Sequence, residues 1–415
     1  MLIRYFSGVR AALAFAVLCA CGSDPVVPID AAPDVSAKET GVDAIADVVD
    51  ASIDVAEEPA GPFPFFAFDL PHLNDYGGPV LASPKVVPIF FANEDSSKIT
   101  AVVDFFSKLP ASSYWTNAAS EYGVGTLTVV PAMMLTENAP TTIDDKGIES
   151  WLTNAIATSK VPANEPSKTI YFLYYPSTTT VTFQGLQSCT GFGGYHSETG
   201  GAAYVEVNGC ASYSARLAPG ESVTGIDEST GLGTHELFEA VTDPYPKTKP
   251  AYGAIDQAHQ AWTKFLYGGE IADTCEMQPG AFFKEPTLGY VVQRMYSNAA
   301  ASSGSDPCIP AIGTPFVEAW PTSDVQLALG QQTTVSIHVA SSAPTGPITV
   351  SAIDESQAHG KVQHLQLSLD KTTAQNGDTL TLTIQVLATD SSGYEGYWIE
   401  TDVGVKRRTA GLVRQ

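Results

Sequence analysis

Between residues 85 and 210, apolar residues occur in short runs separated by polar segments. Runs of this kind, rich in aromatic and β-branched residues, predict strands that are buried on both faces. Four segments have this pattern: 85–91, 126–130, 168–176 and 201–210.

Two intervening segments carry apolar residues three and four positions apart, which predicts helices. In 96–109 the predicted apolar face consists of Ile99, Val102, Val103 and Phe106. The second helix, within 142–159, begins at Thr142 or Asp144, because either side chain can cap a helix. Strands alternating with helices predict a mixed α/β (α+β) domain, which we place at 63–310.

After Pro310 the pattern changes to strict alternation of apolar and polar residues. Four segments follow it: 333–341, 346–354, 362–370 and 377–389. Short alternating strands separated by turn residues predict an all-β, immunoglobulin-like sandwich over 311–415. We interpret its three histidines, His338, His359 and His364, as structural or solvated.

The first twenty residues have the composition of a signal peptide. Arg4 and Arg10 precede an apolar run at 11–21 that is too short to span a membrane. The run ends in Leu-Cys-Ala-Cys at 18–21, which resembles the lipobox of bacterial lipoproteins. The resemblance implies cleavage before Cys21, lipidation of its thiol and anchoring to a membrane. Gly22 then implies the outer membrane or cell surface; an ordinary secretory signal is the alternative.

Residues 21–62 are acidic and lack aromatic side chains. Within 24–62 there are ten acidic residues and one basic residue, Lys38. This composition predicts a disordered tether. The net charge of the whole chain, -24, argues against nucleic acid as a partner.

The chain has six cysteines, and four remain once Cys19 is removed and Cys21 is acylated. An even number in an oxidising compartment predicts two disulfides, with three possible connectivities. Of these we favour Cys189–Cys210 together with Cys275–Cys308, because neighbouring pairs close the shortest loops.

The stretch GLGTHELFEAVTDP at 231–244 combines a predicted helix with metal-binding residue types. On a helix, His235 and Glu239 lie one turn apart on the same face, and both are good zinc ligands. Glu236 would take the proton of the attacking water, as in H-E-x-x-H metallopeptidases, with Glu239 in place of the second histidine. The alternative is an acidic, solvated helix face.

We expect this helix to run from Ser229 to Val241 and to end at Pro244. Three residues could cap its N-terminus: Asp227, Ser229 and Thr230. The strand before it, within 202–207, is expected to be an edge strand along which a substrate binds.

Further candidates for the site lie on both sides of the helix. We choose Glu270 as the third metal ligand and Asp273 as the residue that orients His235, although these roles could be exchanged. Asp243 is a weaker candidate. His196, in a Gly-rich loop beside Tyr195, is either a ligand, a hydrogen-bond donor or a structural histidine, and we interpret His259 as structural.

Several of these motifs together resemble a known family. The segments GGPVLASPKVVPIFF, GGYHS, THELFEAVTDP and GGEIADTCE are similar to the exordium (phosphate-induced protein) superfamily, over about Gly77 to Cys275. Plant members are extracellular proteins linked to growth. Bacterial relatives with H-E-x-x-E are zincin-like, which implies a zincin-like fold here and a metal site at His235, Glu236 and Glu239. Glu239 in place of His leaves the metal identity open.

These observations predict a lipid-anchored zinc metallohydrolase, most consistent with a peptidase acting on a peptide or protein substrate. The alternative is a non-catalytic binding or adhesion protein with a structural or calcium site. The nucleophile motif G-x-S-x-G is absent, which argues against a serine hydrolase.

Overall fold

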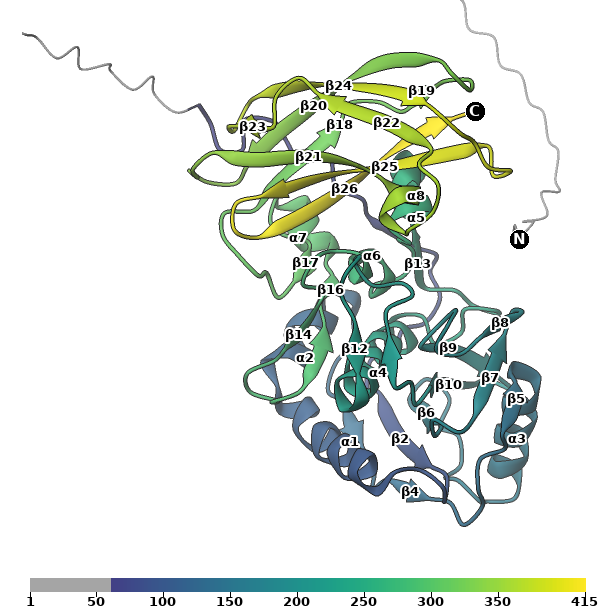
Figure 1. Cartoon of the computed structure of the whole chain (residues 1–415). Coiled ribbons are helices and arrows are strands. Elements are labelled where there is room, and N and C mark those ends of the chain that lie inside the picture. Colours follow the sequence, from purple (N-terminus) through teal and green to yellow (C-terminus); the bar gives the residue numbers. More distant parts are fainter. Residues whose placement is uncertain (1–60) are drawn as a thin grey trace, which may run out of the picture. The chain divides into compact units, whose positions relative to one another are not determined.

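The computed structural model describes residues 61–415. The predicted signal peptide, the lipidation at Cys21 and almost all of the predicted tether therefore lie outside the described residues. The described chain is mixed α+β and rich in sheet, as the alternating patterns predict (Figure 1).

The central element of the first part is a sheet whose middle strands are buried on both faces. Its order is β3-β2-β6-β10-β9, and β4 also pairs with β2. All neighbours are parallel except β9, which is antiparallel to β10. The strands are β2 (Lys85–Phe90), β3 (Thr128–Val129), β4 (Met133–Met134), β6 (Thr169–Tyr174), β9 (Gly194–Thr199) and β10 (Ala202–Val207). The structure confirms the buried strands predicted at 85–91 and 168–176.

The prediction that residues 202–207 form an edge strand is wrong by one position in the sheet. Residues Ala202–Val207 form β10, which lies between β6 and β9, and the edge strand is β9. The hairpin at Gly200 and Gly201, both with positive φ, folds β9 back beside β10 and covers the edge that the sequence pattern left open.

Helices cover both faces of the sheet, because side chains of β6 point alternately to two separate cores. Ile170 and Phe172 pack with helices α1 and α4, while Tyr171 and Leu173 pack with α3. The helices of this part are α1 (Ser96–Lys108), α2 (Ser113–Ala119), α3 (Asp145–Ala157), α4 (Gly225–Thr242), α5 (Gln260–Phe265), α6 (Asp273–Glu276) and α7 (Asn298–Ser302).

Helices α1 and α3 begin close to where the sequence predicts. Asp144 caps α3 by accepting the N–H of Gly147, so Asp144 rather than Thr142 begins this helix. The buried face of α1 includes Val102 and Phe106 as predicted, but Val103 is 38% exposed and Phe105 lies in the core instead.

Helix α4 begins four residues earlier than predicted. Its N-cap is Thr224, and the hydroxyls of Ser229 and Thr230 bond back to the carbonyls of Gly225 and Ile226. These two residues therefore lie inside the helix and do not cap it. Asp227 lies in the first turn, where a negative charge is favourable. None of the three predicted caps is the N-cap.

Short elements complete the first part and frame the sheet. Paired strands are β1 (Leu73–Asp75) with β13 (Tyr252–Ile255), β11 (Ser212–Tyr213) with β12 (Val223–Thr224), β14 (Phe282–Lys284) with β15 (Val291–Gln293), and β16 (Met295–Tyr296) with β17 (Cys308–Ile309). A three-stranded sheet contains β5 (Thr142–Asp144), β7 (Thr180–Phe183) and β8 (Leu186–Gln187). Single 3-10 turns lie at Leu109–Ala111, Ser120–Tyr122 and Gln257–His259.

Both predicted disulfides are confirmed. Cys189 bonds to Cys210, and Cys275 bonds to Cys308. The first ties the loop before β9 to the segment after β10. The second ties α6 to β17, so each bond fixes a segment close to one end of the candidate site described below.

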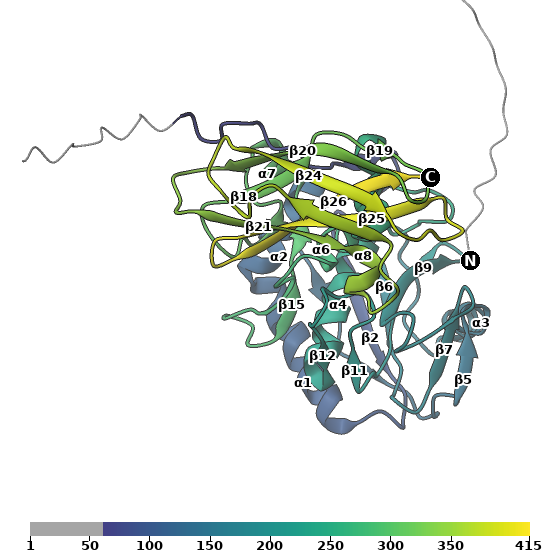
Figure 2. The ribbon, with the colours of Figure 1, turned by 45° about the horizontal axis from the view of Figure 1, so that its top comes forward.

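From Val317 onward the chain forms two sheets that enclose one apolar core (Figures 1 and 2). One sheet has the order β18-β20-β24-β22 and the other β19-β26-β25-β21-β23. If β18, β20, β21, β22, β24, β25 and β26 are lettered A to G, the two sheets have the orders ABED and GFC. This order is similar to that of immunoglobulin sandwiches. The strands and the one helix are β18 (Val317–Pro321), β19 (Val325–Gln326), β20 (Gln332–Ser341), β21 (Ile348–Asp354), α8 (Glu355–Ala358), β22 (Leu365–Leu369), β23 (Thr373–Ala374), β24 (Thr379–Val386), β25 (Tyr394–Asp402) and β26 (Lys406–Arg414).

The β-sandwich is bound to the first part through a shared core. Trp398 and Leu412 belong to the same apolar cluster as residues of α4 and α5. The indole N–H of Trp398 donates to the carbonyl of Phe265 at 2.8 Å. Buried Asp306 accepts from Arg294 of the first part and from Arg407 of β26. Residues Gly61–Gln415 accordingly form one compact unit.

One buried acid near this boundary predicts a pH-dependent stability. Glu318 is 3% exposed, and one of its carboxylate oxygens has no hydrogen-bond partner. Burial raises its pKa from 4.5 to about 8. The folded chain therefore holds this proton more tightly than the unfolded chain does, and stability falls as the pH rises from about 4.5 to 8.

We expect Glu318→Gln, which stays neutral, to remove this loss. The free energy of unfolding of the variant minus that of wild type should be about 2–4 kcal/mol larger at pH 9 than at pH 5. Denaturant unfolding at the two pH values measures the difference. An equal effect at both values would contradict the buried-acid interpretation.

Candidate metal centre

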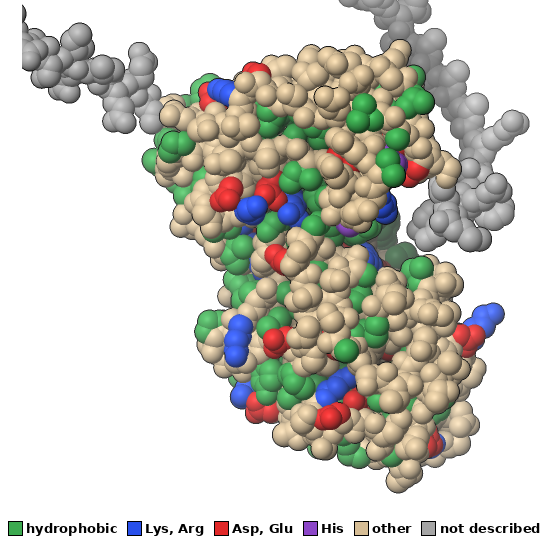
Figure 3. Space-filling model, in the orientation of Figure 1, with side chains coloured by type: hydrophobic (Ala, Val, Ile, Leu, Met, Phe, Trp, Pro, Cys, Tyr) green, Lys and Arg blue, Asp and Glu red, His purple; other side chains and the backbone are tan. Residues whose placement is uncertain are grey.

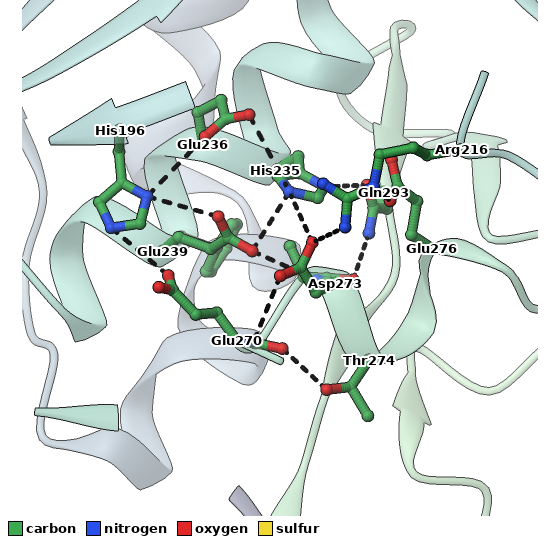
Figure 4. Close-up of polar contacts among 12 residues, drawn as sticks. His196, Arg216, His235, Glu236, Glu239, Glu270, Asp273, Thr274, Glu276 and Gln293 are labelled. Carbon is green, nitrogen blue, oxygen red and sulfur yellow. Dashed lines mark hydrogen bonds and ion pairs between the residues drawn. The ribbon is translucent and has the colours of Figure 1, made fainter. Parts of the chain in front are cut away.

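The candidate site lies where helix α4 packs beside the edge strand β9. His235, Glu236 and Glu239 lie in the C-terminal half of α4 and are 4–5% exposed, so the helix face that carries them is not solvated. His196 points toward them from β9, and Glu270 and Asp273 approach from the segment that leads into α6 (Figure 4). The structure therefore brings together the residues predicted from three separate stretches of sequence.

The close packing of α4 fixes where these side chains point. Two glycines allow the approach: a Cβ at Gly233 would lie 3.0 Å from the Tyr174 hydroxyl, and one at Gly231 would lie 2.9 Å from Phe282. On the same side the Thr230 hydroxyl donates to the carbonyl of Val291 at 2.8 Å. The helix is thus held against both β6 and β15.

The two nitrogens of His235 have different roles. Nδ1 lies 2.8 Å from Oε1 of Gln293, whose amide nitrogen donates to the carbonyl of Ala272 at 2.7 Å. The amide oxygen is therefore the acceptor, and Nδ1 keeps its proton. Nε2 is directed at Oε1 of Glu239, 3.2 Å away, and at Oδ1 of Asp273, 3.7 Å away.

The contacts of the two downstream acids bear on the roles that the sequence left exchangeable between them. Gln293, and not Asp273, orients His235 through Nδ1. Asp273 is instead the downstream acid that faces His235 Nε2, and its backbone N–H donates to Glu239 Oε1 at 3.2 Å. Glu270 Oε2 lies 3.4 Å from Nε2 of His196, and among the described residues no ion pair joins Glu270 to His235.

His196 lies on a strand, not in the predicted loop. Its Nδ1 is 3.4 Å from Glu239 Oε2 and 3.8 Å from Glu236 Oε2, and its side chain is 7% exposed. Because side chains alternate along a strand, neighbouring Tyr195 points to the opposite face, where its hydroxyl donates to Asp145. Tyr195 and His196, although adjacent in the sequence, therefore point to different faces of the sheet.

The remaining sequence candidates lie outside the group or at its margin. Asp243 ends α4 and accepts the N–H of Ala251 at 2.8 Å, so its carboxylate caps a turn near Glu270. His259 contacts Asp256 and Asp69, remote from the site. The sandwich histidines pair with local groups: His338 stacks on Phe66, His359 contacts Glu355 and His364 contacts Glu395.

Three residues that lie close to His235 or Asp273 are not predicted from the sequence. Besides Gln293, they are Arg216 and Glu276: the guanidinium of Arg216 contacts Asp273 at 2.9 Å and Glu276 at 3.3 Å. Gln293 and Arg294 together interrupt the apolar stretch at 290–296, and polar residues within a buried stretch are the signal that could have indicated Gln293. Nothing comparable distinguishes Arg216 or Glu276.

The carboxylates determine the protonation of the two imidazoles. Burial by itself would lower the pKa of each histidine, but neighbouring acids raise it well above its ordinary value. For His196 the largest of these is Glu270, and for His235 it is Glu239. Without a cation, therefore, both imidazoles take up protons.

The pKa values of the acids are shifted in different directions. Burial raises the pKa of Glu236 and, more strongly, that of Glu270. For Glu239 burial is outweighed by His235 and His196, so its pKa lies below the ordinary value. The same oxygen and nitrogen atoms can exchange these protons for a cation, because metal ligands must be deprotonated.

The donor set is suitable for a metal ion. Two groups have one ligand atom from each member within 4.8 Å of the others: His235, Glu236 and Glu239, and His196, Glu239 and Glu270. Oε2 of Glu270 and Nε2 of His196 are buried without a hydrogen-bond partner. Imidazole nitrogen combined with carboxylate oxygen is a set that zinc accepts, whereas calcium takes oxygen ligands.

These groups open onto a cavity of about 680 Å³. His196, Glu236, Glu239 and Glu270 line one wall, and Phe183, Leu186, Phe192 and Tyr195 line another part. The cavity follows β9, which has β10 on one side and, among the described residues, no strand on the other.

Comparisons with known proteins leave the family unassigned. No protein-family model and no curated protein matches the chain. Among solved structures, a conjugative transposon lipoprotein from Bacteroides eggerthii is 10% identical over 24% of this chain and 95% of that one, with a TM-score of 0.18. A FixG-related protein from Vibrio parahaemolyticus is 7% identical over 25% and 98%, with a TM-score of 0.19. We draw neither fold nor function from similarities this weak.

Two surface features complete the description. None of the helices within 61–415 has the length and apolar character that a membrane crossing requires. On the face drawn in Figure 3, basic side chains are scattered among acidic ones instead of being gathered in one area.

The hydrogen bond between Gln293 and His235, which we call the clamp, predicts two effects of Gln293→Leu. The change leaves His235 Nδ1 and the Ala272 carbonyl without partners, so the free energy of unfolding should fall by about 2–4 kcal/mol in the metal-free chain. Zinc affinity should fall about 10- to 100-fold, because the ligand loses its orienting partner.

Gln278→Leu is the matched control, because this buried glutamine also makes two hydrogen bonds, both to the backbone of Arg408. It should lower stability similarly and leave zinc affinity unchanged. Thermal unfolding with and without zinc separates the two effects, and an equal zinc-induced shift in both variants would contradict the clamp.

Proposed function

We propose that this chain is a zinc-dependent hydrolase that cleaves peptide bonds. The observation that carries the proposal is the state of His235: Gln293 holds its Nδ1 while Nε2 is directed at Glu239 and Asp273. A buried imidazole with one nitrogen fixed and the other facing carboxylates is the arrangement of a metal ligand. We propose His235, Glu239 and Asp273 as the residues that hold the ion.

Glu236 is the proposed general base. A bound zinc ion would polarise the scissile carbonyl and make water acidic enough to attack near neutral pH. The Glu236 carboxylate lies 4.0 Å from His235 Nε2 and lines the cavity, so it is placed to accept a proton from the attacking water. It would then return that proton to the leaving amine.

The open edge of β9 supports a peptide as the substrate. An extended chain can add to a free strand edge through main-chain hydrogen bonds, and its side chains then alternate between the two faces. Such a chain would pass His196 and reach Glu236. This arrangement agrees with the proposed resemblance to the exordium superfamily and with a zincin-like domain.

The anchoring by Cys21 and a place at the cell surface belong to the same proposal. They rest on the lipobox-like sequence at 18–21. Two disulfides close to the site are consistent with a protein that works in an oxidising compartment.

One observation favours a second candidate, a non-catalytic binding protein with a calcium site. Carboxylates outnumber imidazoles in the cluster, and oxygen ligands are those that calcium takes. The two candidates differ in the cation retained and in whether Glu236 matters.

The test uses the purified full chain, elemental analysis and cleavage of a fluorescently labelled, unfolded protein. Glu239→Ala should lose zinc. Glu236→Gln should retain zinc while the cleavage rate falls about 10²- to 10⁴-fold. Glu228→Gln is the matched control, because Glu228 is a buried glutamate of α4 that contacts Ser229 and Cys210, and it should retain both zinc and activity.

Stoichiometric calcium without zinc, together with no cleavage, would favour the binding protein. Absence of any cation from wild type and all variants would overturn both candidates and leave a structural ionic cluster.

A further inference from the structure

The cleft contains more potential ligands than one catalytic zinc ion uses. Such an ion typically takes three protein ligands and leaves one position for water. The three ligands proposed above, His235, Glu239 and Asp273, already supply that number. His196 and Glu270 remain, and no step of the proposed mechanism uses them.

The two groups share a single residue, Glu239, and its two oxygens face opposite sides. Oε1 lies 3.2 Å from His235 Nε2, and Oε2 lies 3.4 Å from His196 Nδ1 (Figure 4). A carboxylate in this position can bind two cations at once, one through each oxygen. An imidazole at the same position could offer only one free nitrogen at a time.

The second group also contains two buried atoms that make no hydrogen bond within residues 61–415. They are Nε2 of His196 and Oε2 of Glu270, which face each other at the ion-pair distance of 3.4 Å. The His196 side chain is 7% exposed. An unpaired buried polar atom costs about 1–3 kcal/mol, so these atoms indicate a missing partner.

The charges of the region point the same way. The carboxylates that surround the two histidines are Glu236, Glu239, Asp243, Glu270, Asp273 and Glu276. Arg216 is the guanidinium that pairs with them, through Asp273 and Glu276. One divalent cation would leave a marked excess of negative charge at a largely buried site, and a second would remove most of it.

We propose that the cleft binds a second divalent cation between His196, Glu239 and Glu270, with Glu239 shared between the two ions. The inference deepens the proposed function and rests on it for the first ion. Two-cation sites with the ions about 3.5–4 Å apart occur in aminopeptidases, and a second cation here could stabilise the negative charge that develops on the peptide carbonyl oxygen when water attacks. His196 and Glu270 would then be ligands, and β9 would carry part of the metal centre as well as the substrate.

The test is the stoichiometry of zinc on the purified full chain after chelation and retitration. Calorimetry and elemental analysis should give two equivalents for wild type. His196→Ala and Glu270→Gln should each bind one, and Glu239→Ala should bind none tightly. With Mn²⁺ instead of zinc, the electron paramagnetic resonance spectrum of wild type should show spin coupling that disappears in His196→Ala.

His259→Ala is the matched control, because His259 also lies between two carboxylates, those of Asp69 and Asp256. It should bind two equivalents, and circular dichroism checks that each variant is folded. One equivalent in wild type, or two in His196→Ala, would overturn the second site and leave the proposed hydrolase intact. No zinc in wild type would overturn both.

Discussion

The structure of the cleft depends on one constraint: carboxylates and imidazoles are buried together, and the chain supplies too few cations to neutralise them. A charge left unpaired in a protein interior costs several kcal/mol. Among residues 61–415, Arg216 pairs with Asp273 and Glu276, whereas the ion pairs of Glu236, Glu239 and Glu270 are with the two histidines alone. The remaining charge has to be balanced by protons or by bound cations.

The surrounding fold prevents these groups from relaxing into solvent. Helix α4 is pressed against β6 and β15 through Gly231, Gly233 and Thr230. Each disulfide lies close to a segment of the candidate site: Cys275 follows Asp273 by two residues, and Cys189 precedes β9. Cross-links that close loops of 21 and 33 residues mainly restrict the unfolded chain. Here one also ties α6, which contains Asp273, to β17, and the other ties the loop before β9 to the segment after β10.

Much of the fold, and the residue types of the site, could be predicted from the sequence, but the contacts within the site could not. Buried strands such as β2 and β6 are local runs, so periodicity reveals them. His196 was placed in a loop because its Gly-rich surroundings conceal a strand that exists only through its pairing with β10. The partner of each histidine depends on how α6 and β15 pack on α4, and spacing along the chain contains no information about that packing.

Glu239 illustrates how a departure from a motif acquires a physical meaning only in the folded chain. In the sequence, a glutamate where H-E-x-x-H has its second histidine weakens the case for zinc, because it replaces a nitrogen ligand with oxygen. In the fold, a second imidazole nitrogen is available from elsewhere, since His196 of β9 lies 3.4 Å from the same glutamate. The carboxylate then connects two imidazoles that lie on different elements, which a histidine with one free nitrogen could not do. In the proposed metal centre, Glu239 would therefore extend the set of ligands from a single helix to a helix and the neighbouring strand edge.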